Sequence, residues 1–577
     1  MTEITWQGDQ NGQSMKTIDN NSFFDNIFEE RAENLSKQEL MTWSVETAQD
    51  RNIIKKLHGL GTKLLSGPRG SGKSTLLRKA YFGLLDSGKV LPAYVNYSQS
   101  LALEPLFHDH ANALQIFRQW VLFKIVVGIG DAFKDAQQAM PEGLEKYVHL
   151  ATNFIGQLEQ GYEPNLENNT LSLSTLKMLI DGWAFGNGFQ RSVLLFDDAA
   201  HAFSALQQRE FFEIFRSLKS RTISPKAAVY PGMTNYSPNF HIGHDAELIE
   251  AWYKPEEDNY LETMKELLQK RLSSDKMSLL DEKTELVEYL ALAAFGLPRS
   301  FLTMISQLLG IEEESPQKPS RNLARQAILR NCSFLRGLFK SLSNKLPRYA
   351  HFVEMGRKLE VAIIRELKNY NKSRDNEQKT VRFGIVEPIE PELMRILALL
   401  EYAGIVRFMD CVNWGQNKSY RRYSVHYALL IEKNALHLGS NYPLSTLIMA
   451  LTNQELHHFR TTHGQRLLGK DFQEKCTLNL APCQNCGVPR ASEEAKFCVE
   501  CGKQLSTVSV YEELLKASID QLPLPEKKIK TLKQQTSIKV VQDILLDEEN
   551  QQIMQVKGIG PFWASRIRNA VEEFVSV

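Results

Sequence analysis

The most informative segment of the chain is Gly67-Pro68-Arg69-Gly70-Ser71-Gly72-Lys73-Ser74-Thr75. Its spacing fits a phosphate-binding loop, in which glycines let successive backbone N–H groups point inward at an anion. The helix predicted to begin near Lys73 would aim its positive end at the same anion. In this pattern Lys73 reaches the β- and γ-phosphates of a nucleotide, and the Ser74 hydroxyl ligates Mg²⁺. The loop therefore predicts a site for ATP and Mg²⁺ that uses all nine residues.

The segments around the loop have the pattern of a strand and a helix. The run Thr62–Ser66 precedes the loop, and a helical pattern over Thr75–Leu85 follows it. Three more β-like runs alternate with helical stretches, at Val90–Tyr97, Ser192–Asp197 and Ala227–Met233. Alternation of this kind predicts an α/β fold with a parallel sheet covered by helices.

A second motif lies at the end of one of these runs, in Ser192-Val-Leu-Leu-Phe-Asp197-Asp198. A carboxylate at the end of a neighbouring strand is what a phosphate-binding loop needs to complete a magnesium site. We predict that Asp197 holds Mg²⁺ through water and that Asp198 orients the attacking water as a base. The alternative is a buried strand that merely ends in two solvated acids.

Together the two motifs resemble the ASCE division of P-loop ATPases, and more narrowly its AAA+ origin-recognition and STAND-like groups. The resemblance covers about residues 23–310 and implies ATP hydrolysis. It implies a polar sensor after the next strand, for which Thr234 and Asn235 are the candidates. It also implies a sensor in a helical lid, where Phe295-Gly296-Leu297-Pro298-Arg299 makes Arg299 the candidate. The alternative for Arg299 is a surface arginine after a Gly-Pro turn.

The chain departs from many members of these families at Asp198. Vigorous AAA+ motors often carry Asp-Glu at this motif, whereas this chain has Asp197-Asp198. The shorter side chain would lie farther from the water. The resemblance therefore implies slow hydrolysis and a nucleotide-gated switch rather than a fast motor.

Four cysteines form two knuckles of one pattern, Cys483-Gln-Asn-Cys486-Gly and Cys498-Val-Glu-Cys501-Gly. Each Cys-x2-Cys turn offers two thiolates, and two facing turns make a closed, tetrahedral Cys₄ site for structural Zn²⁺. The segment resembles a zinc ribbon. A redox pair is the alternative, and the doubled motif argues against it.

The last segment resembles a helix-hairpin-helix, on the residues Val556-Lys557-Gly558-Ile559-Gly560 and Arg566-Ile567-Arg568. The resemblance implies that backbone N–H groups at Gly558 and Gly560 approach a DNA phosphate, with Lys557, Arg566 and Arg568 as further contacts. Residues 511–577 hold nine Lys/Arg against ten Asp/Glu. A protein-docking role of the module is therefore the alternative.

The middle of the chain is locally basic, with sixteen Lys/Arg against five Asp/Glu between Gln317 and Arg382. Such an excess indicates a surface for a polyanion, or else a solvated helical face. A predicted helix at Pro391–Ala403 and a hairpin of Ile405–Val412 with Tyr420–Leu430 outline a winged helix. Its wing would bring Lys418, Arg421 and Arg422 to a phosphate backbone.

The predicted units are a leader at 1–22, the ATPase core at 23–250, a helical lid at 251–315, a basic winged-helix-like region at 316–470, a zinc ribbon at 475–507 and a helix-hairpin-helix at 510–577. The start of the chain is polar and acidic rather than a secretory signal, and no run is long enough to span a membrane. The paired cysteines suit a reduced compartment. We therefore expect a cytoplasmic protein without a membrane partner.

These observations lead to two hypotheses. In the first, the chain is a DNA-associated ATPase, in a homo-oligomer or a heteromeric complex, acting in defence against foreign DNA, repair or replication. In the second, it is a nucleotide-gated scaffold that recruits a separate effector, such as a nuclease, through protein contacts.

Overall fold

The computed structural model describes residues 32, 35–97, 112–159, 162, 170–199, 205–311, 318–414, 418–439, 441–452, 454, 458–490, 495, 497–505, 510–547 and 550–575. The predicted leader lies outside them, as do residues 312–317 before the basic region and residues 415–417 at the tip of the predicted wing.

The amino-terminal unit contains the predicted parallel sheet. Its strands are β1 (Lys63–Ser66), β2 (Val90–Asn96), β3 (Arg191–Asp197), β4 (Ile223–Val229) and β5 (Glu247–Glu250). They pair in parallel in the order β2-β3-β4-β1-β5, so the α/β prediction is confirmed and β5 is an additional edge strand. Because β4 lies between β1 and β3, the phosphate loop and the acidic motif flank the turn that follows β4.

Helices cover both faces of this sheet. They are α2 (Lys37–Trp43), α3 (Ala48–His58), α4 (Lys73–Ser87), α6 (Ala113–Asp135), α7 (Leu144–Glu159), α8 (Leu173–Gly186) and α9 (Ala205–Leu218). The Tyr94 ring of β2 lies 6.1 Å from that of Tyr81 on α4, whereas a Cβ on Gly128 of α6 would lie 3.0 Å from Val95 Cγ2. Neighbouring strand residues point to opposite faces, so α4 and α6 lie on opposite sides of the sheet.

Helix α6 is long and apolar enough to cross a membrane by length and composition, with a mean hydropathy of 1.3. However, 72% of that window is buried inside the structure, where the helix packs on β2 and α7. Helix α6 is therefore a core helix of the sheet unit.

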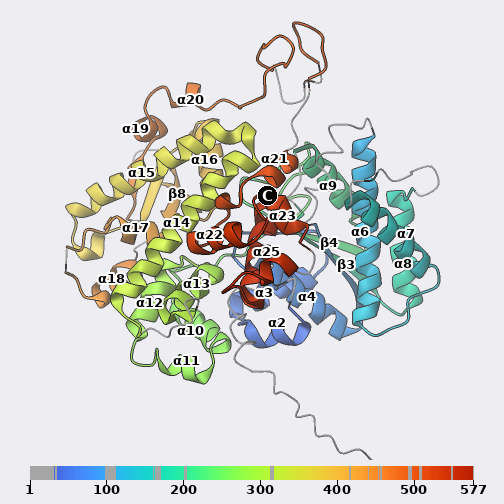
Figure 1. Cartoon of the computed structure of the whole chain (residues 1–577), viewed down its shortest axis with the longest axis horizontal. Helices are drawn as coiled ribbons and strands as arrows, with labels where there is room; N and C mark the ends of the chain where they lie inside the picture. Colours follow the sequence, from blue (N-terminus) through green and yellow to red (C-terminus); the bar gives the residue numbers. More distant parts are fainter. Residues whose placement is uncertain are drawn as a thin grey trace, which may run out of the picture.

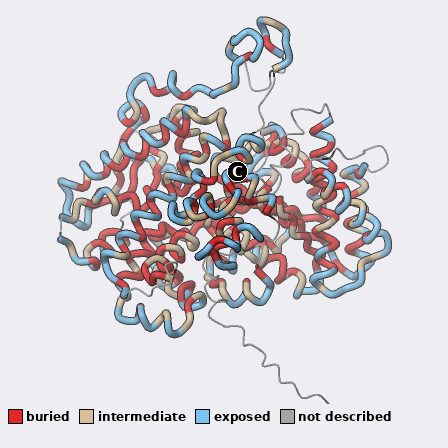
Figure 2. The backbone as a smooth tube through the Cα atoms, viewed as in Figure 1, coloured by how far each residue is buried: buried red, intermediate tan, exposed pale blue. Residues whose placement is uncertain are grey.

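The lid and the middle region share one hydrophobic core. Their helices are α10 (Tyr260–Arg271), α11 (Ser274–Ser278), α12 (Thr284–Ala293), α13 (Pro298–Leu309), α14 (Arg321–Lys345), α15 (Ala350–Lys372), α16 (Pro391–Tyr402), α17 (Tyr427–Glu432), α18 (Leu444–Thr452), α19 (Gly464–Leu468) and α20 (Phe472–Lys475), with short 3₁₀ turns η5 (Pro347–Tyr349) and η6 (Asn376–Gln378). Figure 2 shows buried residues running without interruption through this half of the molecule.

A second sheet in this region has the order β7-β8-β6-β9, from β6 (Arg382–Val386), β7 (Val406–Asn413), β8 (Ser419–Val425) and β9 (Arg460–Thr462). Helix α16 precedes the antiparallel β7–β8 pair, so the predicted helix and hairpin are both present. The predicted second strand, Tyr420–Leu430, is too long. It ends at Val425 because His426 caps α17, where its Nδ1 accepts the N–H of Ala428 at 3.2 Å.

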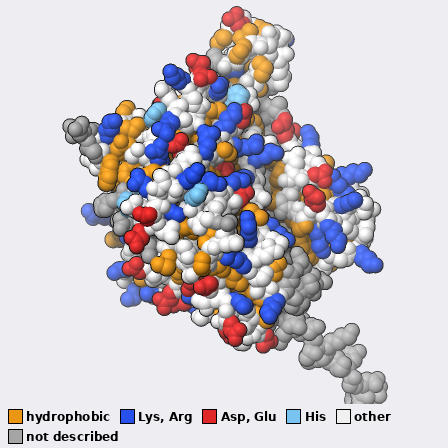
Figure 3. Space-filling model, turned by 90° about the vertical axis from the view of Figure 1, so that its left-hand side faces the viewer, with side chains coloured by type: hydrophobic (Ala, Val, Ile, Leu, Met, Phe, Trp, Pro, Cys, Tyr) orange, Lys and Arg blue, Asp and Glu red, His pale blue; other side chains and the backbone are white. Residues whose placement is uncertain are grey.

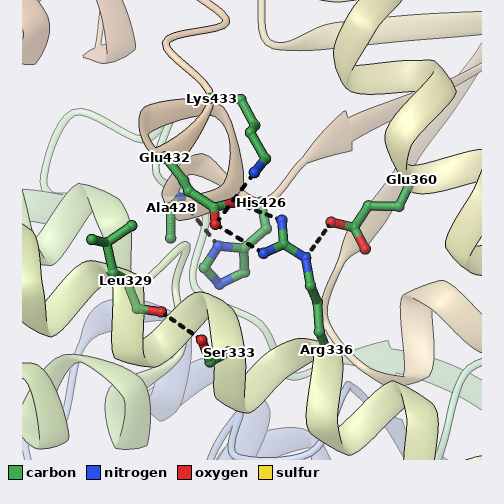
Figure 4. Close-up of polar contacts among 8 residues, drawn as sticks. All are labelled: Leu329, Ser333, Arg336, Glu360, His426, Ala428, Glu432 and Lys433. Carbon is green, nitrogen blue, oxygen red and sulfur yellow. Dashed lines mark hydrogen bonds and ion pairs between the residues drawn. The ribbon is translucent and has the colours of Figure 1, made fainter.

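Part of the basic charge of this region serves the interior. Arg336 of α14 donates to Glu360 of α15 at 2.8 Å and to Glu432 of α17 at 2.6 and 3.0 Å (Figure 4). Arg382 and Lys345 are buried. Figure 3 shows Lys and Arg side chains spread over this side of the molecule, with Asp and Glu side chains among them.

The carboxy-terminal unit has its own small core. It consists of α21 (Val510–Lys516), η7 (Ile519–Gln521), α22 (Glu526–Gln535), α23 (Val541–Leu545), α24 (Gln551–Met554) and α25 (Pro561–Val575). In Figure 1 it lies at the front and centre, between the sheet unit and the lid. The cysteine-rich segment after α20 instead extends away from the body at the top of the figure.

Candidate functional site

The phosphate loop has the backbone that its sequence predicts. Gly72 caps α4 with a φ of 91°, and α4 begins at Lys73 with Ser74 in its first turn. Gly70 also has a positive φ, of 81°. At Gly67 a Cβ would lie 2.6 Å from both Ala251 O and Ser71 Oγ, so only glycine fits.

One buried polar atom in the loop supports a phosphate ligand. The hydroxyl of Ser71 is buried and has no hydrogen-bond partner among the described residues. Buried polar atoms usually have a partner, and an orphaned one indicates an absent ligand or water. The residues present therefore fit a nucleotide phosphate at this loop.

Lys73 is held against the loop itself. Its Nζ donates to Gly67 O at 2.8 Å and to Pro68 O at 3.0 Å, and it lies 3.7 Å from the centre of the Tyr230 ring. Burial lowers its pKa to about 7, although Asp198 and Asp197 nearby raise it. A phosphate group would add acceptors and negative charge to the two carbonyl oxygens that Lys73 Nζ contacts among the described residues.

The two acids lie at the end of β3, as predicted. Asp197 is 1% exposed, and its Oδ2 accepts the Tyr94 hydroxyl at 2.7 Å while its Oδ1 accepts the N–H of Asp198 at 3.0 Å. Asp198 has a positive φ of 51°, and its Oδ1 accepts the Tyr230 hydroxyl at 2.9 Å. These bonds fix the orientation of both carboxylates, whose oxygens are ligands of the kind that Mg²⁺ prefers.

Tyr230 is a site residue that the sequence did not reveal. It follows β4 and contacts Lys73 and Asp198, and its ring lies 5.4 Å from that of Tyr402 on α16. Burial raises its pKa well above the usual value, so the hydroxyl stays protonated and donates to Asp198. Its position at the end of the strand beside β1 was the one available signal.

The candidate sensors after β4 are engaged in local structure. Thr234 Oγ1 donates to Tyr230 O at 3.0 Å and accepts its N–H at 3.2 Å. The Asn235 N–H and side-chain amide both donate to Gln208 Oε1, at 2.6 and 2.8 Å. Both side chains therefore stabilise the turn and its contact with α9, and the strand ends at Val229 rather than at the predicted Met233.

Arg299 lies beside the phosphate loop, as the resemblance implied. A Cβ on Gly70 would lie 3.5 Å from Arg299 Cβ. The lid segment is broken just before this residue, because Phe295 and Gly296 have φ angles of 54° and 79°. This break turns α13 so that its first residues face the loop.

Both arginines at the loop contact one carboxylate from the last helix. Arg299 Nη1 donates to Glu573 Oε1 at 2.7 Å, and Arg69 Nη2 lies 3.5 Å from the same oxygen. Burial alone would lower the pKa of Arg69, but Glu573, Tyr402, Tyr230 and Asp198 hold it above its usual value. One carboxylate therefore pairs with both Arg69 and Arg299.

A third cation anchors the same turn of α25. Lys345, at the end of α14, is 5% exposed and donates to the backbone oxygen of Glu573 at 2.9 Å. Burial lowers its pKa well below the usual value. Glu573 thus contacts the lid, the end of α14 and the phosphate loop at once.

The four paired cysteines form one cluster. Sγ of Cys483 lies 3.6 Å from that of Cys501, Cys486 lies 3.5 Å from Cys498, and all four sulfurs lie within 4.8 Å of one another. A tetrahedral site with Zn–S bonds of about 2.3 Å requires sulfurs roughly 3.8 Å apart, so the cluster fits zinc.

The backbone of the two knuckles is equivalent. The N–H of Gly487 donates to Cys483 O at 2.8 Å, and that of Gly502 donates to Cys498 O at 3.0 Å. The two glycines have φ angles of 73° and 67°. The backbone N–H of Lys503 lowers the pKa of the Cys501 thiol to about 6, which favours the thiolate that binds metal.

Two of the predicted DNA contacts are engaged inside the protein. Arg422 pairs with Asp410 at 2.7 and 2.5 Å and is nearly buried, because it lies opposite Asp410 in the β7–β8 pair. Arg568 donates to Asp547 O at 2.9 Å and to Ile544 O at 3.3 Å, where it caps α23. In this structure both predicted phosphate contacts therefore stabilise the protein itself.

The remaining candidates lie in more open positions. Lys557 is exposed, beside Gly558 with its φ of 83° and one turn before α25. Arg566 stacks over Trp563 at 4.9 Å, and Arg421 over Phe408 at 4.3 Å. Lys418 and Gly560 are exposed. The cationic side chains among them could contact phosphate, and Gly560 leaves room for a close backbone approach.

A scan against protein-family models finds no match, and a search of curated proteins finds none either. Solved structures do match. A Walker-type ATPase of Pyrococcus abyssi is 15% identical, with a TM-score of 0.36, over 71% of this chain and 100% of its own. Cdc6p from Pyrobaculum aerophilum is 14% identical, with a TM-score of 0.29, over 74% and 97%. The Aeropyrum pernix ORC1 protein, solved in complex with DNA, is 14% identical, with a TM-score of 0.28, over 68% and 91%.

Proposed function

We propose that this chain binds and slowly hydrolyses Mg-ATP as a conformational switch in a DNA transaction. The observation that carries the proposal is the contact of Glu573 with Arg69 and Arg299, at 3.5 and 2.7 Å, beside an intact phosphate loop. A carboxylate on these two cations occupies charges that would otherwise bind a γ-phosphate.

The first step follows from charge. A triphosphate in the loop brings a higher negative charge than one carboxylate and offers more acceptor oxygens to each arginine. Arg69 and Arg299 therefore bind the triphosphate in preference to the carboxylate of Glu573. This exchange removes the ion pair between Arg299 and Glu573 and so loosens the carboxy-terminal unit from the lid, while the bond from Lys345 to the backbone oxygen of Glu573 can stay in place.

The residues of the loop and the two acids after β3 have separate roles in the reaction. Lys73 and the N–H groups of the loop hold the phosphates, while Ser74 and Asp197 would hold Mg²⁺, which neutralises charge on the phosphate oxygens. Asp198 orients the attacking water. Asp198 accepts the Tyr230 hydroxyl at Oδ1, so Oδ2 is the oxygen that would orient the water. The short side chain of Asp198 supports slow turnover.

Support for the DNA part comes from the carboxy-terminal turn. Lys557 is exposed next to the Gly558 turn at the start of α25, where backbone N–H groups can meet a phosphate. Such contacts position a nucleic acid without reading its sequence.

The test is phosphate release from ATP by the full chain, with and without DNA at two salt concentrations. The proposal expects slow release that DNA changes, loss of turnover but retained ATP binding in Asp198→Asn, and loss of both in Lys73→Ala. Turnover by Asp198→Asn equal to that of the unmodified chain, or rates that DNA leaves unchanged at both salt concentrations, would overturn it.

A further inference from the structure

A large cleft separates the carboxy-terminal unit from α13 and α14. Its volume is about 1280 Å³, which exceeds the range of roughly 300–1,000 Å³ typical of small-molecule sites. In Figure 1 the carboxy-terminal unit is drawn in red at the front, beside α13 and α14. A cleft of this size suits a polymer better than a metabolite.

The charge of the cleft is strongly one-sided. Six basic side chains from five segments of the chain line the cleft: Arg299, Arg330, Lys527, Lys528, Lys557 and Arg566. Among the described residues that line the cleft, Glu573 is the one carboxylate, and it already faces Arg69 and Arg299. Cations on both walls of one cleft are the electrostatic footprint of a polyanion.

Apolar side chains are exposed between these cations. Phe334 of α14 is 42% exposed and lines the cleft, and Leu329 one turn earlier is 39% exposed. In a nucleic-acid duplex the base faces are stacked inside, so they cannot stack on an exposed phenyl ring. In a single strand the unpaired bases can stack on aromatic side chains while the phosphate backbone follows the basic wall.

We propose that this cleft binds a single strand of nucleic acid, with its phosphates along Arg330, Lys527 and Lys557 and a base against Phe334. The inference rests on the DNA association proposed above and names the form of DNA. It also places the strand next to the nucleotide, because Arg299 and Glu573 line the cleft and meet the phosphate loop at its inner end.

Fluorescence anisotropy of a labelled oligothymidylate of about 20 nucleotides tests the proposal, with the full chain in the absence of nucleotide. Lys527→Glu and Arg330→Glu, on opposite walls, each lower the affinity by about tenfold or more and lessen its salt dependence. Lys530→Glu and Arg325→Glu are matched controls, because these residues are exposed on the same two helices but do not line the cleft. The controls keep most of the affinity.

The stacking contact has a test of its own. Phe334→Ala lowers the affinity for the single strand by about tenfold, whereas Phe334→Trp retains it. The same strand annealed to its complement binds more weakly than the single strand. Equal or tighter binding of the duplex, or equal losses in the cleft and control variants, would overturn the proposal. ATP binding measured on the same samples separates this outcome from a failure of the nucleotide switch.

Discussion

Arg299 and Glu573 join the lid to the last helix of the chain, with 2.7 Å between Nη1 of the arginine and Oε1 of the glutamate. The same carboxylate oxygen lies 3.5 Å from Arg69 in the phosphate loop. This carboxylate therefore connects three parts of the chain that are far apart in sequence, and it does so beside the phosphate loop.

Replacing Glu573 by glutamine removes the charge that competes with phosphate. Glu573→Gln therefore binds Mg-ATP about two- to tenfold more tightly, a range set by the modest strength of partly exposed ion pairs. Isothermal titration calorimetry measures the change. Glu572→Gln is the matched control, since Glu572 pairs with Arg568 at 3.5 Å, and its affinity stays near that of the unmodified chain. An unchanged or weaker affinity in Glu573→Gln contradicts the competition.

The lowered pKa of Lys73 predicts proton uptake when ATP binds. Burial brings this pKa to about 7, so at pH 8 roughly nine in ten free molecules carry a neutral Lys73. The triphosphate favours the charged form, and the pKa therefore rises on binding. Affinity then falls as pH increases above about 7, because each binding event must capture a proton.

Calorimetry in two buffers with different ionisation enthalpies measures this uptake directly. Binding at pH 8 takes up a large part of one proton, and binding at pH 6 takes up little through this group, because Lys73 is already charged. Equal uptake at the two pH values would show that Lys73 is charged in the free protein.

Gly67 is predicted to be intolerant of any side chain. In Gly67→Ala the new methyl group would lie 2.6 Å from Ala251 O, so the loop must shift, ATP binding is lost and the melting temperature falls. Gly182→Ala is the control on α8, where a Cβ meets nothing within 4 Å and alanine favours the helix by about 1 kcal/mol. Its melting temperature stays equal or rises. Normal ATP binding by Gly67→Ala would contradict the close packing of the loop against Ala251.

The cysteine cluster predicts one tightly bound zinc ion per chain. Metal analysis of the purified protein gives one zinc, and Cys486→Ser or Cys498→Ser reduces that content to near zero. Cys411→Ser is the control, because Cys411 is exposed on β7 outside the cluster. ATP binding survives removal of zinc once Mg²⁺ is restored, since the cysteine-rich segment extends away from the sheet unit. A full zinc content in the double variant Cys486→Ser/Cys498→Ser contradicts the assignment.

The parts of the site that could be predicted from the sequence are those with local signals. Three motifs are each contained within a few residues of sequence: the loop from Gly67 to Thr75, the acids after β3 and the cysteine knuckles. Their backbone conformations require glycines at fixed positions or a short apolar strand, and both can be recognised in the sequence. Arg299 was found through a Gly-Pro turn of the same local kind. These elements lie where the sequence predicts.

The rest depends on packing between distant segments. Glu573 reaches the loop because Leu346 and Lys345 dock the carboxy-terminal unit at the end of α14, and nothing near position 573 indicates this. Tyr230 and Tyr402 meet because the turn after β4 packs on α16, where a Cβ on Gly232 would overlap Ala398. Arg422 shows the same dependence on packing, since its basic side chain pairs with Asp410 across the hairpin.

The central claim is that the loop at Gly67–Thr75 takes up a triphosphate with the help of Lys73. Binding of Mg-ATP to the full chain, measured by calorimetry beside Lys73→Ala, tests it most directly. We predict saturable binding of one nucleotide per chain that requires magnesium and is lost in Lys73→Ala. Absence of binding by the unmodified protein, or equal binding by Lys73→Ala, would contradict the account.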